Sequence, residues 1–387
     1  MILNNVNIPG QAELQHIQVT GSKISKISSD TNLPEKSTAI QIDLTGAFAS
    51  PGFINSHDHL DFNLFPQTGN CIYNNYADWG RDIHKNNKAV IDAVLKIPHQ
   101  LRVQWGIYKN LLNGITTVVN HGKKISINNE LVTVLQHNHS LHSVQFEKNW
   151  KWKLNNPFIK NSCFVIHLGE GTDDASADEI NEVIRWNLFK RKIVAVHGVS
   201  MQPLQAKSFN AIVWCPASNF FLLNKTAPIN LLKNETNILF GTDSTLTAGW
   251  NVWEQLRQAR TTNMINDEAL FKTITSNAAE VWGLKSKGRL AETFDADIII
   301  AEKKEQPAEW DSFYSIDPHN ILLILHKGIV RMFDEKLKAQ ICEKNFPISE
   351  YSRIKMNGKE KYVHGDVPLL MKEIKKFYPQ ADFPISY

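Results

Sequence analysis

The sequence has few cysteines, little net charge and no long apolar run, and each shortage excludes a class of protein. Its four cysteines lie far apart and form no C-x-x-C motif, which argues against a cysteine-only zinc site and fits a reducing compartment. No run reaches the roughly 18 apolar residues of a membrane span, and the first residues lack a signal-peptide pattern. We therefore expect a cytoplasmic protein with no membrane partner.

The charge balance also argues against a nucleic-acid partner. Lysine and arginine number 42 and acidic residues 39, a net charge of +3, and the basic residues are spread along the chain. The densest basic stretch, KNWKWK at 148–153, is interpreted as a solvated loop over packed aromatic side chains. The 387 residues, 42% of them hydrophobic, suffice for a barrel of about 250 residues and a smaller domain.

The pattern of apolar residues changes along the chain. Residues 1–49 alternate short β-rich runs with polar turns, which predicts an antiparallel sheet. From residue 51, apolar runs alternate with segments of helical period, as in a parallel α/β fold. The α/β part shows seven predicted strands, one fewer than a closed eight-stranded barrel needs: 52–55, 115–120, 143–147, 163–167, 192–197, 211–215 and 237–243.

The remaining segments predict helices and a second β-rich region. Helices are expected over 90–112, 177–190, roughly 250–263 and 267–282, and the run LVTVLQ at 131–136 is interpreted as a helix end. Short β-rich apolar runs return from about residue 285, so residues 1–50 and 285–345 are expected to form one composite β-domain. Residues 51–284 would then be the barrel, and 346–387 an extension with a strand and a helix packed on the body.

Residues that can bind a metal follow several of the predicted strands. In a (β/α) barrel the chemistry lies at the carboxyl ends of the strands. His57 and His59 follow the first predicted strand, His167 and His197 end two later ones, and Asp243 ends the last. We expect these five side chains to meet at one rim of the barrel.

The H-x-H pair would be weak evidence without this placement. With 14 histidines in the chain, chance alone gives roughly half an H-x-H pair. Side chains at positions i and i+2 of an extended chain point to the same side, so two imidazoles can reach one cation. Asp58 between them points away and is interpreted as a spacer. The same spacing at His137 and His139 is interpreted as a solvated helix end.

The residue types suit hydrolysis. Neutral imidazoles with one carboxylate leave a divalent cation with residual positive charge, which lowers the pKa of bound water. Glu170, three residues after His167 on a strand end turning into a loop, can supply an acid-base group to the same pocket. His197 is placed to orient the attacking water or to polarise the bond that breaks.

The sequence resembles the amidohydrolase superfamily, and within it the branch of cytosine, guanine and S-adenosylhomocysteine deaminases and triazine hydrolases. The resemblance covers most of residues 1–335, and the motifs together and in this order are specific for the superfamily. They are PGFINSHDH (51–59), GITTVVN (114–120), IHLGEG (166–171), VAVHGV (194–199), WCPASN (214–219), LFGTDS (239–244), TSNAAEVWGL (275–284) and GRLAETFDADIII (288–300).

The resemblance implies a distorted (β/α)8 barrel of the TIM type flanked by a β-sandwich from both chain ends. It implies one divalent metal ion, zinc in preference to iron or manganese, held by His57, His59, His167 and Asp243. Glu170 would protonate the ring nitrogen or leaving group, while His197 and Asp243 would hold and deprotonate the water. The expected reaction is hydrolysis of a non-peptide C-N bond, by deamination of a small purine, pyrimidine or triazine-like heterocycle.

The substrate is less well defined by the motifs. Contacts are expected from Trp79, in an aromatic-rich segment that follows the first strand, and from Trp214 and Asn219. Trp214 stands where the deaminases often have a histidine. The expected partner is a small molecule, and a homo-oligomer is compatible with the sequence.

Two other interpretations stay open at this point. In the first, a carbamylated lysine bridges two metals in a cyclic-amide hydrolase, His167 and His197 are both ligands, and Lys148 is the bridging candidate. In the second, the barrel has lost catalysis and serves in binding, although all six expected polar groups are present.

Overall fold

The strands from both ends of the chain share one nine-stranded sheet. The computed structural model describes residues 1–29, 40–127, 130–159, 163–306, 308–342 and 346–387. The strand order is β16-β17-β15-β14-β13-β4-β1-β2-β3. Its strands are β1 (Ile2–Asn7), β2 (Gln15–Thr20), β3 (Lys23–Ser28), β4 (Gln41–Pro51), β13 (Ile298–Glu302), β14 (Ile321–His326), β15 (Ile329–Asp334), β16 (Tyr351–Met356) and β17 (Lys359–His364).

Strand β4 joins the two halves of this sheet. Its first half pairs in parallel with β1, and its second half pairs antiparallel with β13, where Ile298 lies opposite Pro51. Buried and exposed residues alternate in the first half, whereas the last five residues are all buried. The sheet therefore has one solvated face at its amino-terminal end and is covered where it meets the rest of the molecule.

Eight further strands are parallel to their neighbours and lie in two sheets, ordered β5-β6-β7 and β12-β11-β10-β9-β8. The backbone N–H of Asp243, after β12, donates to the carbonyl of His57 in β5 at 3.1 Å. The two sheets therefore meet there. The strands are β5 (Phe53–Asp58), β6 (Ile115–Asn120), β7 (Thr133–Leu135), β8 (His139–Ser143), β9 (Phe164–Leu168), β10 (Ile193–His197), β11 (Ala211–Trp214) and β12 (Asn237–Phe240).

Two of the predictions for this region are wrong. The run 131–136, interpreted as a helix end, contains β7, because β-branched Thr133 and Val134 favour an extended chain. The strand predicted at 143–147 ends at Ser143 and begins at His139. His139 therefore lies in a strand and not at a helix end. With β7, the α/β part has the eighth parallel strand that the sequence had seemed to lack.

The helices depart from prediction mainly at prolines and turns. The helix predicted over 90–112 is two helices, because Pro98 lacks an N–H and caps the second. The region predicted as helical over 267–282 is also divided in two. The helices are α1 (Tyr76–Asn86), α2 (Lys88–Leu95), α3 (His99–Leu112), α4 (Trp150–Leu154), α5 (Asp174–Trp186), α6 (Pro203–Ala206), α7 (Pro216–Leu223), α8 (Ile229–Leu232), α9 (Val252–Thr261), α10 (Asp267–Thr273), α11 (Ser276–Val281), α12 (Glu309–Tyr314), α13 (Lys338–Ile341) and α14 (Val367–Phe377), with short 3-10 turns at Leu60–Phe62, Pro318–Asn320, Glu335–Leu337 and Ile348–Glu350.

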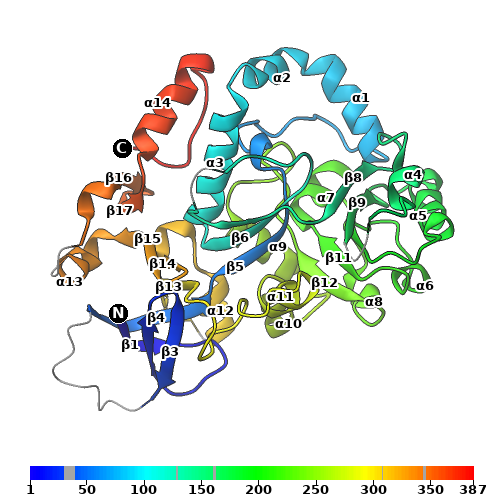
Figure 1. The fold of residues 1–387 in the computed structure, drawn as a ribbon. Helices are drawn as coiled ribbons and strands as arrows, with labels where there is room; N and C mark the ends of the chain where they lie inside the picture. Colours follow the sequence, from blue (N-terminus) through cyan, green and yellow to red (C-terminus); the bar gives the residue numbers. More distant parts are fainter. Residues whose placement is uncertain (30–39, 128–129, 160–162, 307, 343–345) are drawn as a thin grey trace.

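The carboxyl-terminal extension packs on α3. It contains the β16–β17 hairpin and α14, so one more strand than predicted, and α14 lies beside α3 (Figure 1). The Tyr108 hydroxyl donates to the carbonyl of His364 at 3.0 Å. The rings of Trp105 and Phe383 meet edge to face, with centroids 4.6 Å apart. The extension therefore holds one face of this helix.

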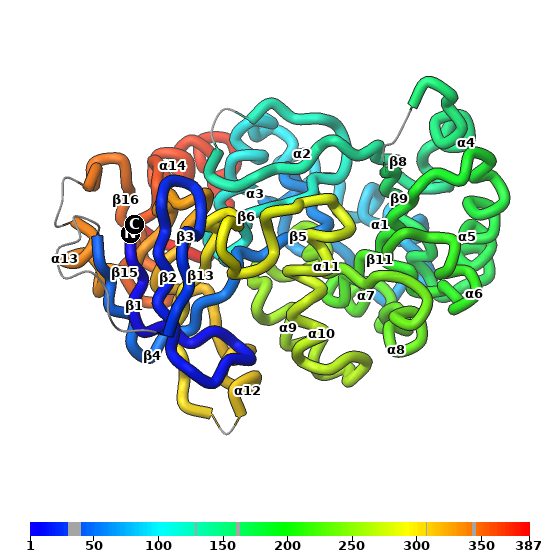
Figure 2. Tube along the Cα trace, turned by 60° about the horizontal axis from the view of Figure 1, so that its bottom comes forward, coloured from blue at the N-terminus to red at the C-terminus, as the bar shows by residue number. Residues whose placement is uncertain are grey.

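The nine-stranded sheet and the region of helices α4 to α6 lie at opposite ends of the molecule (Figure 2). The largest buried apolar cluster fills the space between the parallel strands and their helices, and it continues to Ile374 in α14. In the part of the chain that the structure describes, no helix is long and apolar enough to cross a bilayer. The molecule is thus a mixed α/β structure with parallel sheets, as predicted.

Candidate metal centre

The carboxyl ends of four parallel strands bring the predicted metal-binding residues together. His57 lies near the end of β5 and His59 just beyond it, His167 lies in β9, His197 ends β10, and Asp243 follows β12. Their possible ligand atoms form two groups, and within each group the atoms lie no more than 4.8 Å apart. One group is His57, His59 and His167, and the other is His57, His197 and Asp243. Both groups share His57, so the structure places all five side chains around one point.

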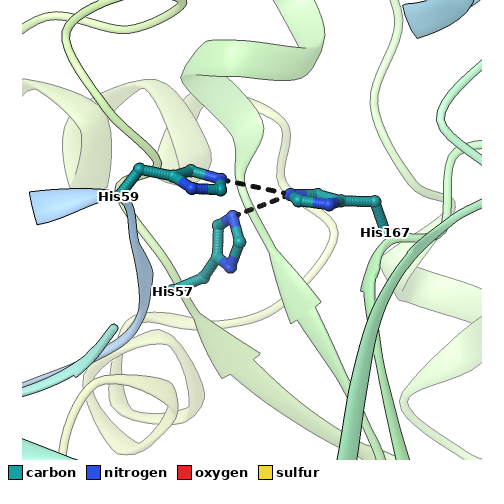
Figure 3. Close-up of side chains that lie close together, drawn as sticks. All are labelled: His57, His59 and His167. Carbon is teal, nitrogen blue, oxygen red and sulfur yellow. Dashed lines mark hydrogen bonds between the residues drawn. The ribbon is translucent and has the colours of Figure 1, made fainter. Parts of the chain in front are cut away.

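Three imidazole nitrogens face one another at the centre of this cluster. Nε2 of His167 lies 3.2 Å from Nε2 of His57 and 3.3 Å from Nε2 of His59 (Figure 3). Burial, and then the charges of neighbouring histidines, hold the pKa of His57 and His167 well below the ordinary value. Both rings are therefore neutral at physiological pH, the form in which imidazole binds a metal.

The tautomer of His167 is fixed by its other nitrogen. Nδ1 lies 2.7 Å from the carbonyl oxygen of His142, and because a carbonyl only accepts, Nδ1 carries the proton. Nε2 then presents a lone pair to the cluster. A carbonyl that orients a metal-binding imidazole in this way is common around metal sites. The nitrogen donors and one carboxylate fit a divalent transition metal such as zinc.

Asp243 supplies the carboxylate. Its Oδ1 lies 3.8 Å from Nε2 of His57 and 3.9 Å from Nε2 of His59, and its Oδ2 accepts hydrogen bonds from Ser218 at 2.8 Å and Thr247 at 2.9 Å. Burial acts to raise its pKa, but the nearby histidines and these hydrogen bonds hold the pKa of Asp243 below its ordinary value. The group is an anion at neutral pH.

His197 faces Glu170. The side-chain amide nitrogen of Asn219, which is a donor, lies 2.9 Å from Nδ1 of His197. The proton of the neutral ring is then on Nε2, which lies 3.4 Å from Oε2 of Glu170. Burial lowers the pKa of His197 to about 4, so this ring stays neutral and offers an N–H, not a lone pair, to the centre.

Backbone strain is concentrated at two of these residues. His197 has a φ of +76° and Asp243 a φ of +53°, in the left-handed region that non-glycine residues seldom adopt. Such conformations persist where the surrounding structure enforces them, and they gather at functional sites.

Glu170 is an acid with a strongly perturbed environment. It is 5% exposed, and burial, followed by the negative charges of Asp243 and Glu179, raises the pKa of Glu170 well above its ordinary value. Its environment therefore favours the protonated form, whereas that of Asp243 favours the ionised form. Two carboxyl groups whose pKa values are pushed apart in one pocket can act as acid and base.

Two adjoining cavities open on this cluster. The inner one, about 100 Å3, is lined by Glu170, His197, Asp243 and the predicted contact Trp79. The outer one, about 570 Å3, has a mixed lining in which Asn120 and Ser140 are polar and Ile125 is apolar. His59, Phe62 and His142 line both cavities, so a molecule bound at the cluster can extend from one into the other.

The other two predicted substrate contacts have different surroundings. Trp214 is fully buried in the apolar core, and its indole N–H donates to Thr226 at 2.6 Å. Asn219 is also fully buried and contacts His197. Neither belongs to the linings of the two cavities near the cluster, so of the three only Trp79 lies in a cavity wall.

Two further histidines at the site were not predicted. His121 follows β6, is 4% exposed, and its ring centroid lies 4.3 Å from that of His167. His142, in β8, provides the carbonyl that orients His167. The rule that singles out strand-end residues could have found His121, since it directly follows the predicted strand 115–120. His142 was hidden because its strand was predicted four residues too late.

The bridging-lysine interpretation finds no support in this geometry. Lys148 lies in an exposed turn between β8 and α4, and it is absent from the linings of the two cavities at the cluster.

Comparison with known proteins finds a matching family model and similar enzymes. Residues 160–330, which carry His167, Glu170, His197 and Asp243, match the model of the amidohydrolase family. The chain is 25% identical to a 5-methylthioadenosine/S-adenosylhomocysteine deaminase of Caldicellulosiruptor saccharolyticus, over 83% of this chain and 89% of the relative.

Solved structures show the same fold. Guanine deaminase from C. acetobutylicum, with bound guanine, superposes with a TM-score of 0.62 at 15% identity, covering 85% of this chain and 99% of that one. An adenosine deaminase from Xanthomonas campestris with bound zinc gives a TM-score of 0.67 at 13% identity and covers 98% of each chain. The predicted resemblance to the amidohydrolases, hydrolases of carbon-nitrogen bonds, is therefore confirmed. The matched segment carries part of the candidate metal centre, whereas His57 and His59 precede it.

Proposed function

We propose that this protein is a metal-dependent hydrolase that deaminates a small heterocyclic amine. One observation carries the proposal: a protonated Glu170 and an ionised Asp243 flank a cluster of imidazole nitrogens at the end of a parallel sheet. The deaminases among the relatives support the same reaction. We further propose a single divalent ion, zinc in preference to iron or manganese, held by His57, His59, His167 and Asp243.

The residues divide the proton transfers between them. When bound, the cation supplies Lewis acidity that lowers the pKa of a water molecule. Asp243 takes one proton from the water and passes it to the leaving amine, which departs as ammonia. Glu170 donates its proton to the ring nitrogen and is reprotonated by the new hydroxyl as that group becomes a carbonyl. The Nε2–H of His197 orients the attacking oxygen.

We propose that the substrate carries a polar substituent on its ring. The inner cavity, about 100 Å3, is roughly the size of one heterocycle and contains Glu170 and Asp243. The outer cavity, about 570 Å3, includes polar side chains that a bare ring would leave without a partner. A nucleoside such as 5-methylthioadenosine, which names the Caldicellulosiruptor relative, fits this description better than a free base.

The proposed architecture follows from the similarity of this chain to the solved deaminase structures. We propose that the eight parallel strands close into a distorted (β/α)8 barrel over residues 51–284. The composite β-sandwich over 1–50 and 285–345, and the extension from residue 346, complete the proposed domains. The nine-stranded sheet supports a β-domain built from both chain ends, and its strands β16 and β17 join the extension to that domain. Cytoplasmic location and a homo-oligomer stay predictions, and the cysteines, all four of them free, fit the first.

A panel of amines tests the function. Zinc-loaded protein is incubated with 5-methylthioadenosine, adenosine, adenine, guanine and cytosine, and ammonia is measured. The proposal predicts release from the substituted purines at a higher kcat/KM than from the free bases. Protein that binds these compounds but releases no ammonia from any of them would favour a barrel that serves only in binding.

A further inference from the structure

Asp58 lies between two proposed metal ligands but faces a different part of the molecule. It is fully buried at the end of β5. Its Oδ1 accepts from the amide of Asn63 at 2.8 Å, and its Oδ2 accepts from Asn110 at 2.7 Å and from Nζ of Lys109 at 3.1 Å. The spacer interpretation is therefore incomplete, because this side chain is the centre of a buried polar network.

Lys109 is the only charged partner of Asp58 in the part of the chain that the structure describes. It is 1% exposed and reaches the network from α3. Its ammonium also donates to Oγ1 of Thr242 at 3.0 Å. A buried ion pair is costly unless further hydrogen bonds satisfy both groups, and here asparagines and a threonine do so.

Thr242 connects this network to the opposite side of the metal centre. It directly precedes Asp243, and its hydroxyl also donates to the carbonyl of Asp243 at 3.0 Å. The side-chain oxygen of Asn55 accepts from the N–H of Thr242 at 3.1 Å and from the N–H of His57 at 3.3 Å. One ammonium group thus contacts two of the three segments that carry proposed ligands, the end of β5 and the loop after β12.

The helix that carries Lys109 is itself held from outside. Tyr108, the preceding residue, donates to the carbonyl of His364, and Trp105 packs on Phe383. Lys109 therefore reaches Asp58 from a turn of α3 that the carboxyl-terminal extension also contacts, and α14 of the extension lies beside this helix (Figure 1). The contact gives the extension a structural link to the site.

We propose that Lys109 and Asp58 are a positioning pair that sets the distance between two of the three ligand-bearing segments of the metal centre. The inference rests on the proposed function, because it assumes that His57, His59 and Asp243 bind a metal. The pair touches neither substrate nor reacting atoms. Its role is to hold β5 and the Asp243 loop at the spacing at which their ligands reach one cation. Residues that contact metal ligands from outside commonly orient those ligands in this way.

Zinc affinity of the folded protein tests this role. Lys109→Met is compared with wild type by competition with a chromophoric chelator, and the visible spectrum of the cobalt-loaded protein reports the ligand geometry. We expect zinc affinity to fall about 10- to 100-fold, the usual effect of losing an outer partner of a metal ligand, with an altered cobalt spectrum.

Lys361→Met is the matched control. Lys361 is also fully buried, and it pairs with Asp334 at 2.5 Å within the nine-stranded sheet. Its substitution is expected to lower thermal stability and to leave zinc affinity unchanged. A Lys109→Met protein that is equally destabilised but binds zinc as wild type does would overturn the positioning role and leave a purely structural pair.

Two more variants cover the case in which Lys109→Met does not fold. Thr242→Val removes one contact of the ammonium and keeps the ion pair, and we expect weaker zinc binding in the same direction. Asp58→Asn with Lys109→Met leaves no unpaired buried charge, so it should regain stability and still bind zinc weakly. Wild-type zinc affinity in both variants would contradict the proposal. Wild-type protein that binds no zinc would instead overturn the metal centre itself.

Discussion

Oε2 of Glu170 lies 3.4 Å from Nε2 of His197, and both side chains are almost completely buried. With Asn219 at the other ring nitrogen, His197 presents an N–H toward a carboxyl group whose pKa is raised well above its ordinary value by burial. The arrangement leaves one acid, one anionic base across the cluster in Asp243, and a neutral donor between them. Each of these assignments has a consequence that can be measured.

Glu170→Gln is expected to lower kcat by about two to four orders of magnitude, since glutamine cannot donate the proton. Zinc content should stay at the wild-type level, because Glu170 is not among the proposed ligands. Steady-state ammonia release and metal analysis check both. Glu268→Gln on α10, an exposed glutamate, is the control and should behave as wild type. Loss of zinc in Glu170→Gln would show that this carboxyl group is a ligand.

Asp243→Asn is expected to abolish turnover and to weaken zinc binding, because the carboxylate is both a proposed ligand and the base. Ser218→Ala removes one hydrogen bond to the same carboxylate and should reduce kcat only partly. Rate measurements at saturating zinc separate the two effects. An Asp243→Asn protein with wild-type kcat under these conditions would disprove its role as base.

His167 and His121 offer a matched pair, since their rings are adjacent and both are buried. His167→Phe should lose zinc, because its Nε2 faces the other imidazoles. His121→Phe should retain about one zinc per chain, because His121 belongs to neither group of converging ligand atoms. Metal analysis after dialysis distinguishes them, and equal zinc loss in both would make His121 a ligand as well.

Glu179 predicts a pH-dependent effect on stability. Burial raises the pKa of Glu179 to about 7, although it accepts from the N–H of Gly169 at 2.7 Å. A carboxyl group with a raised pKa costs no stability below pH 4.5, where it is protonated in both the folded and the unfolded state. The cost grows as pH rises to 7 and is constant above it.

Glu179→Gln should therefore raise the free energy of unfolding at pH 8 by up to about 3 kcal/mol and change it little at pH 4. Denaturant unfolding at the two pH values measures the difference. A stabilisation of the same size at both would show that the charge of Glu179 is not its cause.

Much of the site could be predicted because its residues lie at the carboxyl ends of buried strands, or just after them, and most of these strands begin with an apolar run. Strands β5, β6, β9 and β10 are buried at every position, so their ends are visible as the point where polar residues begin. Strand β8 was misplaced because it is rich in histidine and serine. Leu141 and Ser143 are buried and His142 is exposed, but this alternation is hidden in the sequence because the surrounding residues are polar.

The network under the metal centre could not be predicted in the same way. Asp58, Lys109 and Thr242 are far apart in the sequence, and nothing in α3 marks one lysine as buried, since its partner is set by tertiary packing. Trp214 is the opposite case, a residue that was predicted at the site but lies elsewhere. Its place in the WCPASN motif indicated the pocket, but strand alternation directs its side chain into the core.

The central claim is that one metal ion per chain supports deamination, and a zinc titration of metal-free protein tests it most directly. Ammonia release from 5-methylthioadenosine, or from the best substrate of the panel, is measured as zinc is added at protein concentrations well above the dissociation constant. The account predicts that the rate rises linearly and reaches its plateau at one equivalent. A plateau at two equivalents, or full activity before any zinc is added to protein shown to be metal-free, would contradict it.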